Sequence, residues 1–519
     1  MSPARPSQHL PQGETMKHRI PPTLLAALLG IPGLMAQEIP VQERVLPNGM
    51  RVILVERSGE PSISCGWVAR VGSADERPGI TGIAHLFEHM MFKGTRVIGT
   101  RDAVRDMELN REQDRVVVTI REEQDLLRER LRRGEIKDIG DPNARTPRLQ
   151  AALDALDKLV REQRELIVKD EFSKVYSQGG ATGMNADTTS DRTFYHIDVP
   201  ANKLELWAWM EADRIRNGVF REFYSERSVV LEERRLRVEA TPYGRTLESF
   251  TAMLWQAHPY RWPVIGWPSD ITTITRDQAD LFFSTYYAPN NISLVLVGDF
   301  RTGEAMATVQ RYFGTLPANP VPPPKVTTLE PPQSGEQRLL AEADAMPMLA
   351  IAHKTVPSVH RDAPALKVLM ALLQGDSGRL KRSLVNEKGI AVFAEAFASG
   401  MKYGGLFFLE AVPAPGHAPE ELEAPLLAEI RTLQEQGVSD RELQKVKNQL
   451  AASALEIIEK NSDLRDQLAE AEGAGTYLDF LAQPARLQAV TREDVMRVAR
   501  AYFTHENRAT VIVRRKEAK

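Results

Sequence analysis

Apolar and polar positions alternate on both sides of Asn48-Gly49, near the start of the chain. An Asn-Gly pair between alternating runs predicts a β-hairpin, because both residues tolerate the positive φ angles of a tight turn. The next apolar run, at 62–73, predicts a further strand, and helices are expected around 80–93 and 200–240. Strands and helices are mixed within one region, which indicates an α+β fold.

The chain also repeats itself. The segment that begins at Thr275 resembles the one that begins at Thr491, 216 residues later. In both segments a threonine opens an amphipathic helix, an aromatic pair follows, and a polar turn with Asn291 or Asn507 leads into an alternating strand. A repeat of this length predicts two homologous halves.

A Pro-rich stretch separates the two copies. Seven prolines fall within 317–332, where they exclude a helix or a central strand. We therefore predict a semi-rigid linker at 314–337 between a first half at 40–313 and a second half at 338–516.

Residues 102–176 interrupt the first half with a highly charged segment. Its apolar positions follow the three-, four- and seven-residue steps of a helix seam: Leu149, Leu153, Leu156, Val160 and Ile167. Glycines and prolines supply a turn in the middle of the segment. The pattern predicts an inserted helical hairpin.

Residues 1–36 predict an export signal with an upstream extension. From Met16, a short basic stretch leads into a mostly apolar run that ends at Ala36. The run is shorter than the roughly 20 residues that span a bilayer, and prolines interrupt it, which disfavours a membrane anchor. Leu34 is larger than the small residue usual before a cleavage site, so the exact site near Ala36 stays open. The expected location is periplasmic or secreted.

Composition narrows the chemistry. The chain has 66 Lys and Arg residues against 70 Asp and Glu residues, so no basic field points to nucleic acid as a partner. Cys65 is the only cysteine, which excludes intramolecular disulfides and thiolate metal sites. Any metal must therefore be bound by histidine and carboxylate.

The strongest chemical signal is His85, Glu88 and His89 in the string HLFEH. Residues four apart on a helix project from one face, so the two imidazoles can bind one ion with Glu88 beside them. H-x-x-E-H is the inverted form of the zinc-peptidase motif H-E-x-x-H, and neutral imidazole suits zinc. The alternative is two unrelated histidines on a surface helix, but the apolar flanking residues argue against it, because unpaired polar groups are costly where burial is expected.

Four strings together resemble the pitrilysin (insulinase) family of zinc peptidases: TGIAHLFEHMMFKGT, NADTTSDRTFYHIDVP, LELWAWMEADRI and ERSVVLEERR. This family includes insulin-degrading enzyme and the mitochondrial processing peptidases, and the resemblance covers nearly the whole chain beyond the export signal. It implies a catalytic pitrilysin-like domain at 40–313, a non-catalytic one at 338–516, and one Zn²⁺ per chain.

The resemblance implies that Glu233 is the third zinc ligand and that Glu226 is a second-shell carboxylate. The residues alone offer four candidates: Glu226, Glu232, Glu233 and Glu239. Glu226 and Glu233 are seven apart, so both can face the same ion, whereas Glu232 points away and suits a solvated partner of Arg235. Between His89 and Glu233 lie 143 residues, nearly twice the gap usual in the family, and the predicted hairpin accounts for the excess.

The string NADTTSDRTFYHIDVP resembles the edge strand on which the family pairs its peptide substrate, which would place Asn185 and Ala186 beside the scissile bond. The alternative is an ordinary strand with Thr193 and Tyr195 packed inward. Three further histidines are not assigned to the metal: His258, His353 and His360.

The second half departs from the family pattern. Self-sufficient members carry an Arg and a Tyr seven residues apart that hold the substrate, but the alignment places Val385 and Val392 there. This implies a second pitrilysin-like subunit that supplies the missing pair. The alternative is a homodimer or monomer that recruits Arg379 or Arg382.

The expected function is an exported zinc endopeptidase that hydrolyses peptides or unfolded polypeptides in a chamber between the two halves. Zinc-bound water would be the nucleophile and Glu88 the general base. The alternative is a non-catalytic peptide-binding or structural subunit of a heteromeric pitrilysin-like complex, against which the intact HLFEH argues. Bound zinc together with peptide hydrolysis would discriminate between the two.

Overall fold

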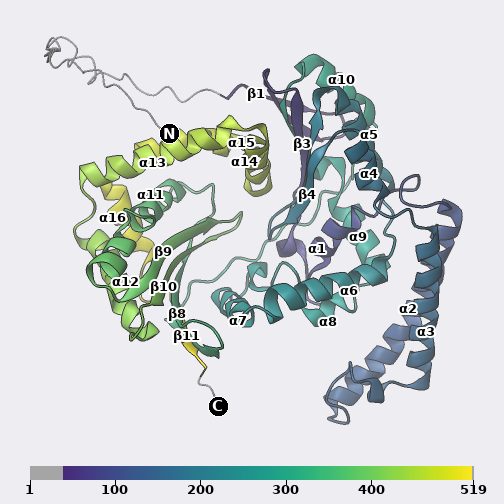
Figure 1. Ribbon diagram of the computed structural model, residues 1–519, viewed down its shortest axis with the longest axis horizontal. Coiled ribbons are helices and arrows are strands. Elements are labelled where there is room, and N and C mark those ends of the chain that lie inside the picture. Colours follow the sequence, from purple (N-terminus) through teal and green to yellow (C-terminus); the bar gives the residue numbers. More distant parts are fainter. Residues whose placement is uncertain (1–38, 517–519) are drawn as a thin grey trace, which may run out of the picture. The chain divides into compact units, whose positions relative to one another are not determined.

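The computed structural model describes residues 39–516 (Figure 1). The predicted export signal lies outside these residues. Within the described part, the helices are all too short or too polar to cross a membrane.

A six-stranded sheet organises the first half. Its strand order is β1-β2-β6-β3-β5-β4, and β2 and β6 run parallel while the other neighbours are antiparallel. The strands are β1 (Val41–Val45), β2 (Arg51–Glu56), β3 (Ser62–Ala69), β4 (Thr182–Thr188), β5 (Thr193–Pro200) and β6 (Ile292–Gly298). The predicted hairpin is confirmed, since β1 pairs antiparallel with β2 and Gly49 between them has a φ of 85°.

A five-stranded sheet organises the second half, with the order β7-β11-β8-β10-β9. The strands are β7 (Gln337–Ala343), β8 (Met348–Thr355), β9 (Ala391–Gly400), β10 (Gly405–Pro413) and β11 (Arg508–Arg515). The order and directions match those of β2-β6-β3-β5-β4, including the one parallel pair, which here is β7 with β11. The two halves therefore share one topology, and the predicted duplication is confirmed.

The duplication extends to single hydrogen bonds. Helices α9 (Arg276–Tyr286) and α16 (Arg492–Tyr502) both begin with a threonine in a capping box. The Asn291 amide donates to the carbonyls of Tyr286 at 2.9 Å and Arg70 at 3.3 Å. The Asn507 amide donates to the carbonyls of Tyr502 at 2.7 Å and Lys354 at 2.8 Å. Each asparagine thus joins the end of a helix to a neighbouring strand.

We expect Asn291→Ala and Asn507→Ala each to lower the free energy of unfolding by about 1–3 kcal/mol, because two carbonyls lose their donor. Chemical denaturation of the two variants and of the exposed control Asn143→Ala measures the effect. Unfolding midpoints equal to that of the control would contradict the shared structural role.

Helices cover both sheets. In the first half they are α1 (Ile83–Met90), α2 (Ala103–Arg132), α3 (Pro147–Leu166), α4 (Glu171–Gln178), α5 (Leu204–Asn217), α6 (Phe223–Arg234), α7 (Gly244–Leu254), α8 (Pro268–Ile271), α9 and α10 (Thr302–Tyr312). In the second half they are α11 (Ala363–Leu373), α12 (Glu423–Glu435), α13 (Asp440–Glu459), α14 (Asn461–Ala474), α15 (Tyr477–Ala489) and α16, of which α14 packs against β3 and β6 of the first sheet. The helical region expected at 200–240 is two helices, because the chain turns after Asn217 and Glu222 adopts a left-handed φ of 53° before α6.

The inserted segment contains α2 and α3, which lie side by side (Figure 1). Leu149 and Val160 are buried, as expected of a helix seam, but Ile167 follows the end of α3. Polar side chains join the two helices near the start of α2 and the end of α3. Gln163 donates to Asp106 at 2.7 Å, and the buried Arg221 guanidinium binds the other oxygen of Asp106 at 2.6 Å.

Candidate metal centre

The two histidines of HLFEH lie on α1, whose first turn is capped from outside the helix. The buried Glu76 carboxylate accepts hydrogen bonds from the backbone N–H groups of Gly82 and Ala84, both at 2.9 Å. Carboxylates stabilise helix N-termini because the first N–H groups lack partners within the helix. Glu76 therefore fixes the start of α1 close to His85.

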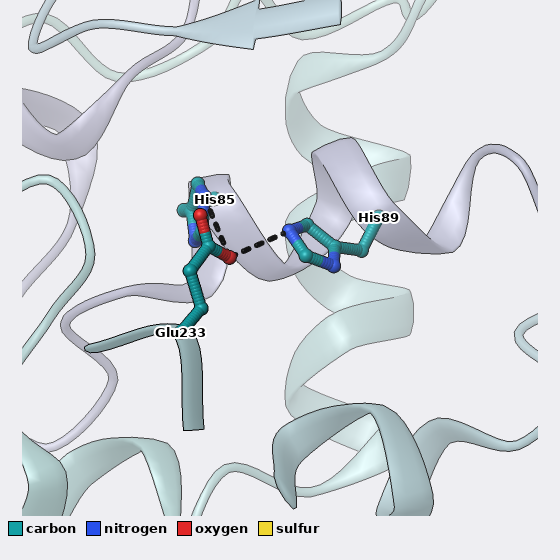
Figure 2. A group of neighbouring side chains, drawn as sticks. All are labelled: His85, His89 and Glu233. Atoms are coloured by element: carbon teal, nitrogen blue, oxygen red, sulfur yellow. Dashed lines mark ion pairs between the residues drawn. The ribbon is translucent and has the colours of Figure 1, made fainter. Parts of the chain in front are cut away.

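His85, His89 and Glu233 converge on one point (Figure 2). Glu233 Oε2 lies 3.2 Å from His89 Nε2 and 3.7 Å from His85 Nε2, and the three ligand atoms are all within 4.8 Å of one another. Two imidazole nitrogens and a carboxylate oxygen form the donor set that catalytic zinc sites use. Because three atoms with lone pairs face each other, the arrangement fits a cation held between them.

The pKa values of the two histidines are shifted in opposite directions. Burial, with the nearby His89 and Arg237, lowers the pKa of His85 to about 3, so this imidazole is neutral and able to bind metal. Burial also acts to lower the pKa of His89, but the hydrogen bond to Glu226 and the charges of nearby carboxylates outweigh it and raise the pKa.

Glu226 orients the His89 ring from the side away from Glu233. Its Oε1 lies 3.1 Å from His89 Nδ1, and its Oε2 lies 2.6 Å from Lys93 Nζ. Burial acts to raise the pKa of Glu226, but the bonds to His89 and Lys93 lower it overall, so the carboxylate stays charged. A carboxylate on the far nitrogen of a ligating histidine sets its tautomer and orientation. Glu226 thus lies between His89 and Lys93, a lysine that the sequence analysis missed.

The other two glutamates considered lie elsewhere. Glu232 is exposed and pairs with Arg235 at 2.5 Å, as predicted. Glu239 ends the π-helical turn Arg235–Glu239 that follows α6, and its carboxylate lies 3.6 Å from the Arg245 guanidinium.

Glu88 is held by a residue that the sequence analysis did not single out. The Thr188 hydroxyl, at the end of β4, donates to Glu88 Oε2 at 2.7 Å. Burial raises the pKa of Glu88, and the Thr188 hydrogen bond opposes this shift. The only signal in the sequence was the position of Thr188 in the same string as Asn185 and Ala186.

Those two residues lie on an edge strand. Within the described part of the chain, β4 pairs only with β5, and it does so with Asn185 opposite His196 and Ala186 opposite Tyr195. The Asn185 side chain is exposed, whereas Ala186 is 7% exposed and packs into the core. Ala186 can therefore meet a ligand only through its backbone. Thr193 and Tyr195 on β5 are buried, as the alternative interpretation required.

A cavity of about 500 Å³ adjoins Glu88 and His89. It lies between α1, β4 and the segment 167–173 that follows the inserted helices. Its lining combines charged residues, among them Lys93, Glu171 and Arg221, with five apolar ones: Phe92, Ile167, Val168, Phe172 and Met184. Asn185 also lines it, so the edge strand faces the same cavity as Glu88 and one candidate ligand, His89.

The remaining histidines considered have structural contacts. His258 Nδ1 accepts a hydrogen bond from the Tyr260 backbone, and His360 Nδ1 accepts one from the Asp362 backbone. Burial lowers the pKa of His353 to about 3. Between residues 39 and 516, only His85, His89 and Glu233 form a group with metal-binding geometry.

In the second half, the two arginines that could replace the missing Arg each lie near a carboxylate. Val385 is half-buried, whereas Val392 is 55% exposed on the edge strand β9. Arg379 is buried and binds both carboxylate oxygens of Glu442, at 2.7 and 2.6 Å. Arg382 is exposed, 3.6 Å from Glu387.

Two family models match the chain. The model described as insulinase (peptidase family M16) matches residues 51–112, which contain the HLFEH motif. The model described as the peptidase M16 inactive domain matches residues 273–450, beginning before the Pro-rich stretch. The chain belongs to the pitrilysin/insulinase family, which confirms the resemblance drawn from its motifs.

Relatives and solved structures agree with this assignment. The zinc protease PqqE of Helicobacter pylori is 26% identical over 92% of this chain and 93% of its own. A crystal structure of a protease from Helicobacter pylori has a TM-score of 0.74 at 24% identity and covers 91% of this chain and 99% of that one. The periplasmic protease PqqL from Escherichia coli has a TM-score of 0.67 at 17% identity and covers 93% of this chain but 48% of PqqL. The two structures share the fold of this chain.

Proposed function

We propose that this protein is a zinc-dependent endopeptidase that hydrolyses peptides or unfolded polypeptides. The observation that carries the proposal is the convergence of His85, His89 and Glu233 on one point, with Glu88 beside them. A relative that covers most of this chain is named a zinc protease, which supports zinc as the metal.

In this proposal His85, His89 and Glu233 hold the metal, and Glu226 keeps the His89 ring in place. When bound, zinc supplies Lewis acidity to the scissile carbonyl and to the attacking water. The Glu88 carboxylate accepts a proton from that water and passes it to the leaving amine nitrogen. The Thr188 hydroxyl keeps the carboxylate turned toward the cavity beside His89.

The edge strand β4 would bind the substrate. An extended peptide can add to an exposed edge through backbone hydrogen bonds, which require no particular side chains in the substrate. Asn185 and the backbone of Ala186 would then lie along the bound peptide, and the adjoining cavity would receive one of its side chains. The substrate chamber between the two halves remains a prediction from the family resemblance.

The export signal remains part of the proposal. The basic and apolar pattern from Met16 to Ala36 supports it. The fold shared with the periplasmic protease PqqL is consistent with a periplasmic or secreted location.

Removal and return of the metal test the function. We expect the purified protein to cleave an unfolded polypeptide, to lose this activity after treatment with a chelator, and to regain it when zinc alone is added. Mass spectrometry of the products identifies internal cleavage. Peptide cleavage that survives complete zinc removal would contradict the proposal. So would a zinc-loaded protein that cleaves no peptide, either alone or together with the second subunit proposed below.

We also propose that a second pitrilysin-like subunit completes the substrate site. Val385 and Val392 offer no charge or hydrogen bond where the family resemblance expects Arg and Tyr. Arg379 is an unsuitable replacement, because leaving Glu442 would strand a partly buried carboxylate.

The chain alone is accordingly expected to bind zinc but to cleave peptides slowly, and its kcat/KM should rise when the partner subunit is added. Co-purification from the native source followed by peptide assays of the separate and recombined fractions measures this. Full turnover by the isolated chain would favour the alternative of a homodimer or monomer, and Arg382→Gln would then test whether that exposed arginine is recruited.

A further inference from the structure

Metal–ligand distances in protein sites vary by only about 0.2 Å, so Glu233 must keep its place relative to two histidines that lie on a different helix. The helices α1 and α6 come from distant parts of the sequence, and α6 gives way to a π-helical turn directly after Arg234. Helix α6 lies against both α1 and α8 (Figure 1). The loop before α8 therefore lies where it can join the two helices that carry the ligands.

Gly266 in this loop contacts the start of α1 backbone to backbone. A Cβ added to Gly266 would lie 2.3 Å from the Thr81 carbonyl oxygen and 2.5 Å from Gly82 Cα. A Cβ added to Gly82 would lie 2.6 Å from the Ile265 carbonyl oxygen. Both glycines have positive φ angles, 83° and 90°, which other residues adopt at a cost.

Side chains strengthen the same junction. The Thr81 hydroxyl accepts a hydrogen bond from the Trp267 backbone at 3.0 Å and donates to Asp270 at 2.7 Å. The start of α1 is therefore held on the 265–267 loop by close backbone contact and by hydrogen bonds.

Arg234 reaches this loop from α6. Its guanidinium donates to the Gly266 carbonyl at 3.0 Å, binds both carboxylate oxygens of Glu248 at 2.7 Å, and lies over the Trp267 ring at 5.6 Å. The Arg234 side chain is 5% exposed. Because Arg234 follows Glu233 directly, a shift of this residue also shifts the carboxylate.

We propose that Arg234 is a positioning residue for the metal centre. Through Gly266 it couples the helix that carries Glu233 to the start of the helix that carries His85 and His89. Glu248 holds the guanidinium in the required orientation, since a bidentate carboxylate fixes its plane. The inference rests on the proposed zinc site but assigns a role to a residue that is not a ligand and makes no contact with substrate.

The test compares Arg234→Gln with Arg235→Gln, the same substitution at the next position, where the arginine is 56% exposed and pairs with Glu232. Zinc affinity is measured by competition with a chromophoric chelator, and the ligand geometry is followed by the visible absorption of the Co²⁺-substituted protein. We expect Arg234→Gln to weaken zinc binding by roughly 10–100-fold and to change the cobalt spectrum, as loss of an outer partner does. Arg235→Gln should match the wild type in both.

The melting temperatures of the metal-free proteins distinguish a positioning role of Arg234 from a role in stability alone. If Arg234→Gln lowers the melting temperature but leaves zinc affinity and the cobalt spectrum unchanged, Arg234 is only structural and the inference is overturned. If Arg234→Gln does not fold, Arg234→Lys decides, because a lysine can pair with Glu248 but cannot bind Glu248 and Gly266 in the same geometry. Zinc binding by Arg234→Lys equal to that of the wild type would overturn the inference. A wild-type protein without zinc would instead reject the proposed function itself.

Discussion

Glu88→Gln is expected to retain zinc while losing on the order of 10²–10⁴ in kcat, because an amide cannot accept and return the proton that the reaction moves. The substitution keeps the size of the side chain and the hydrogen bond with Thr188, so the neighbouring groups stay in place. Steady-state cleavage of a fluorogenic peptide, with zinc content measured on the same samples, gives both quantities.

Glu239→Gln is the matched control, since Glu239 lies near Arg245 and outside the ligand group. It should cleave at the wild-type rate. A Glu88→Gln variant that cleaves as fast as the control would reject Glu88 as the base. A variant that loses zinc would show instead that the carboxylate contributes to metal binding.

Glu233→Gln should lower zinc affinity by at least the roughly 10–100-fold that loss of an outer partner costs, because a charged ligand becomes a neutral one. Glu232→Gln, one residue earlier and exposed beside Arg235, should bind zinc like the wild type. Competition with a chelator measures both affinities under the same conditions. If the two variants exchange behaviour, the register of the third ligand on α6 is wrong by one residue.

Much of the first-half topology follows from local pattern. Asn48-Gly49 specified the β1–β2 hairpin, and the repeat from Thr275 and Thr491 specified the shared helix, turn and strand of both halves. These features depend on neighbouring residues, so the sequence reports them directly. The boundary at Glu222 did not follow, because a left-handed turn at a glutamate has no local signature.

Some residues of the candidate metal centre could be identified from the sequence more readily than others. His85, Glu88 and His89 share one helix, and their spacing alone brings them together. Glu233 came from the family resemblance, because the seven-residue spacing alone fits Glu226 with Glu233 and Glu232 with Glu239 equally well. Thr188 was missed because its contact with Glu88 spans 100 residues and depends on how β4 packs against α1.

Contacts between distant charged residues were beyond the sequence analysis. Glu472 on α14 is fully buried and accepts hydrogen bonds from Arg70 at 2.6 Å and Ser293 at 2.8 Å. The hydrogen bonds of Arg234 with Glu248 and with the Gly266 carbonyl likewise depend on the tertiary structure. A charged side chain that is removed from water needs a specific partner. Which side chains are buried depends on the tertiary structure, so the local sequence does not show these pairs.

X-ray diffraction from crystals of the wild-type protein, recorded on both sides of the zinc absorption edge, shows whether His85, His89 and Glu233 bind zinc. We expect one anomalous peak per chain, between His85 Nε2, His89 Nε2 and Glu233 Oε2, that disappears when the wavelength crosses to the low-energy side of the edge. Absence of a peak there in crystals grown with zinc, or a zinc peak held by other residues alone, would contradict this expectation.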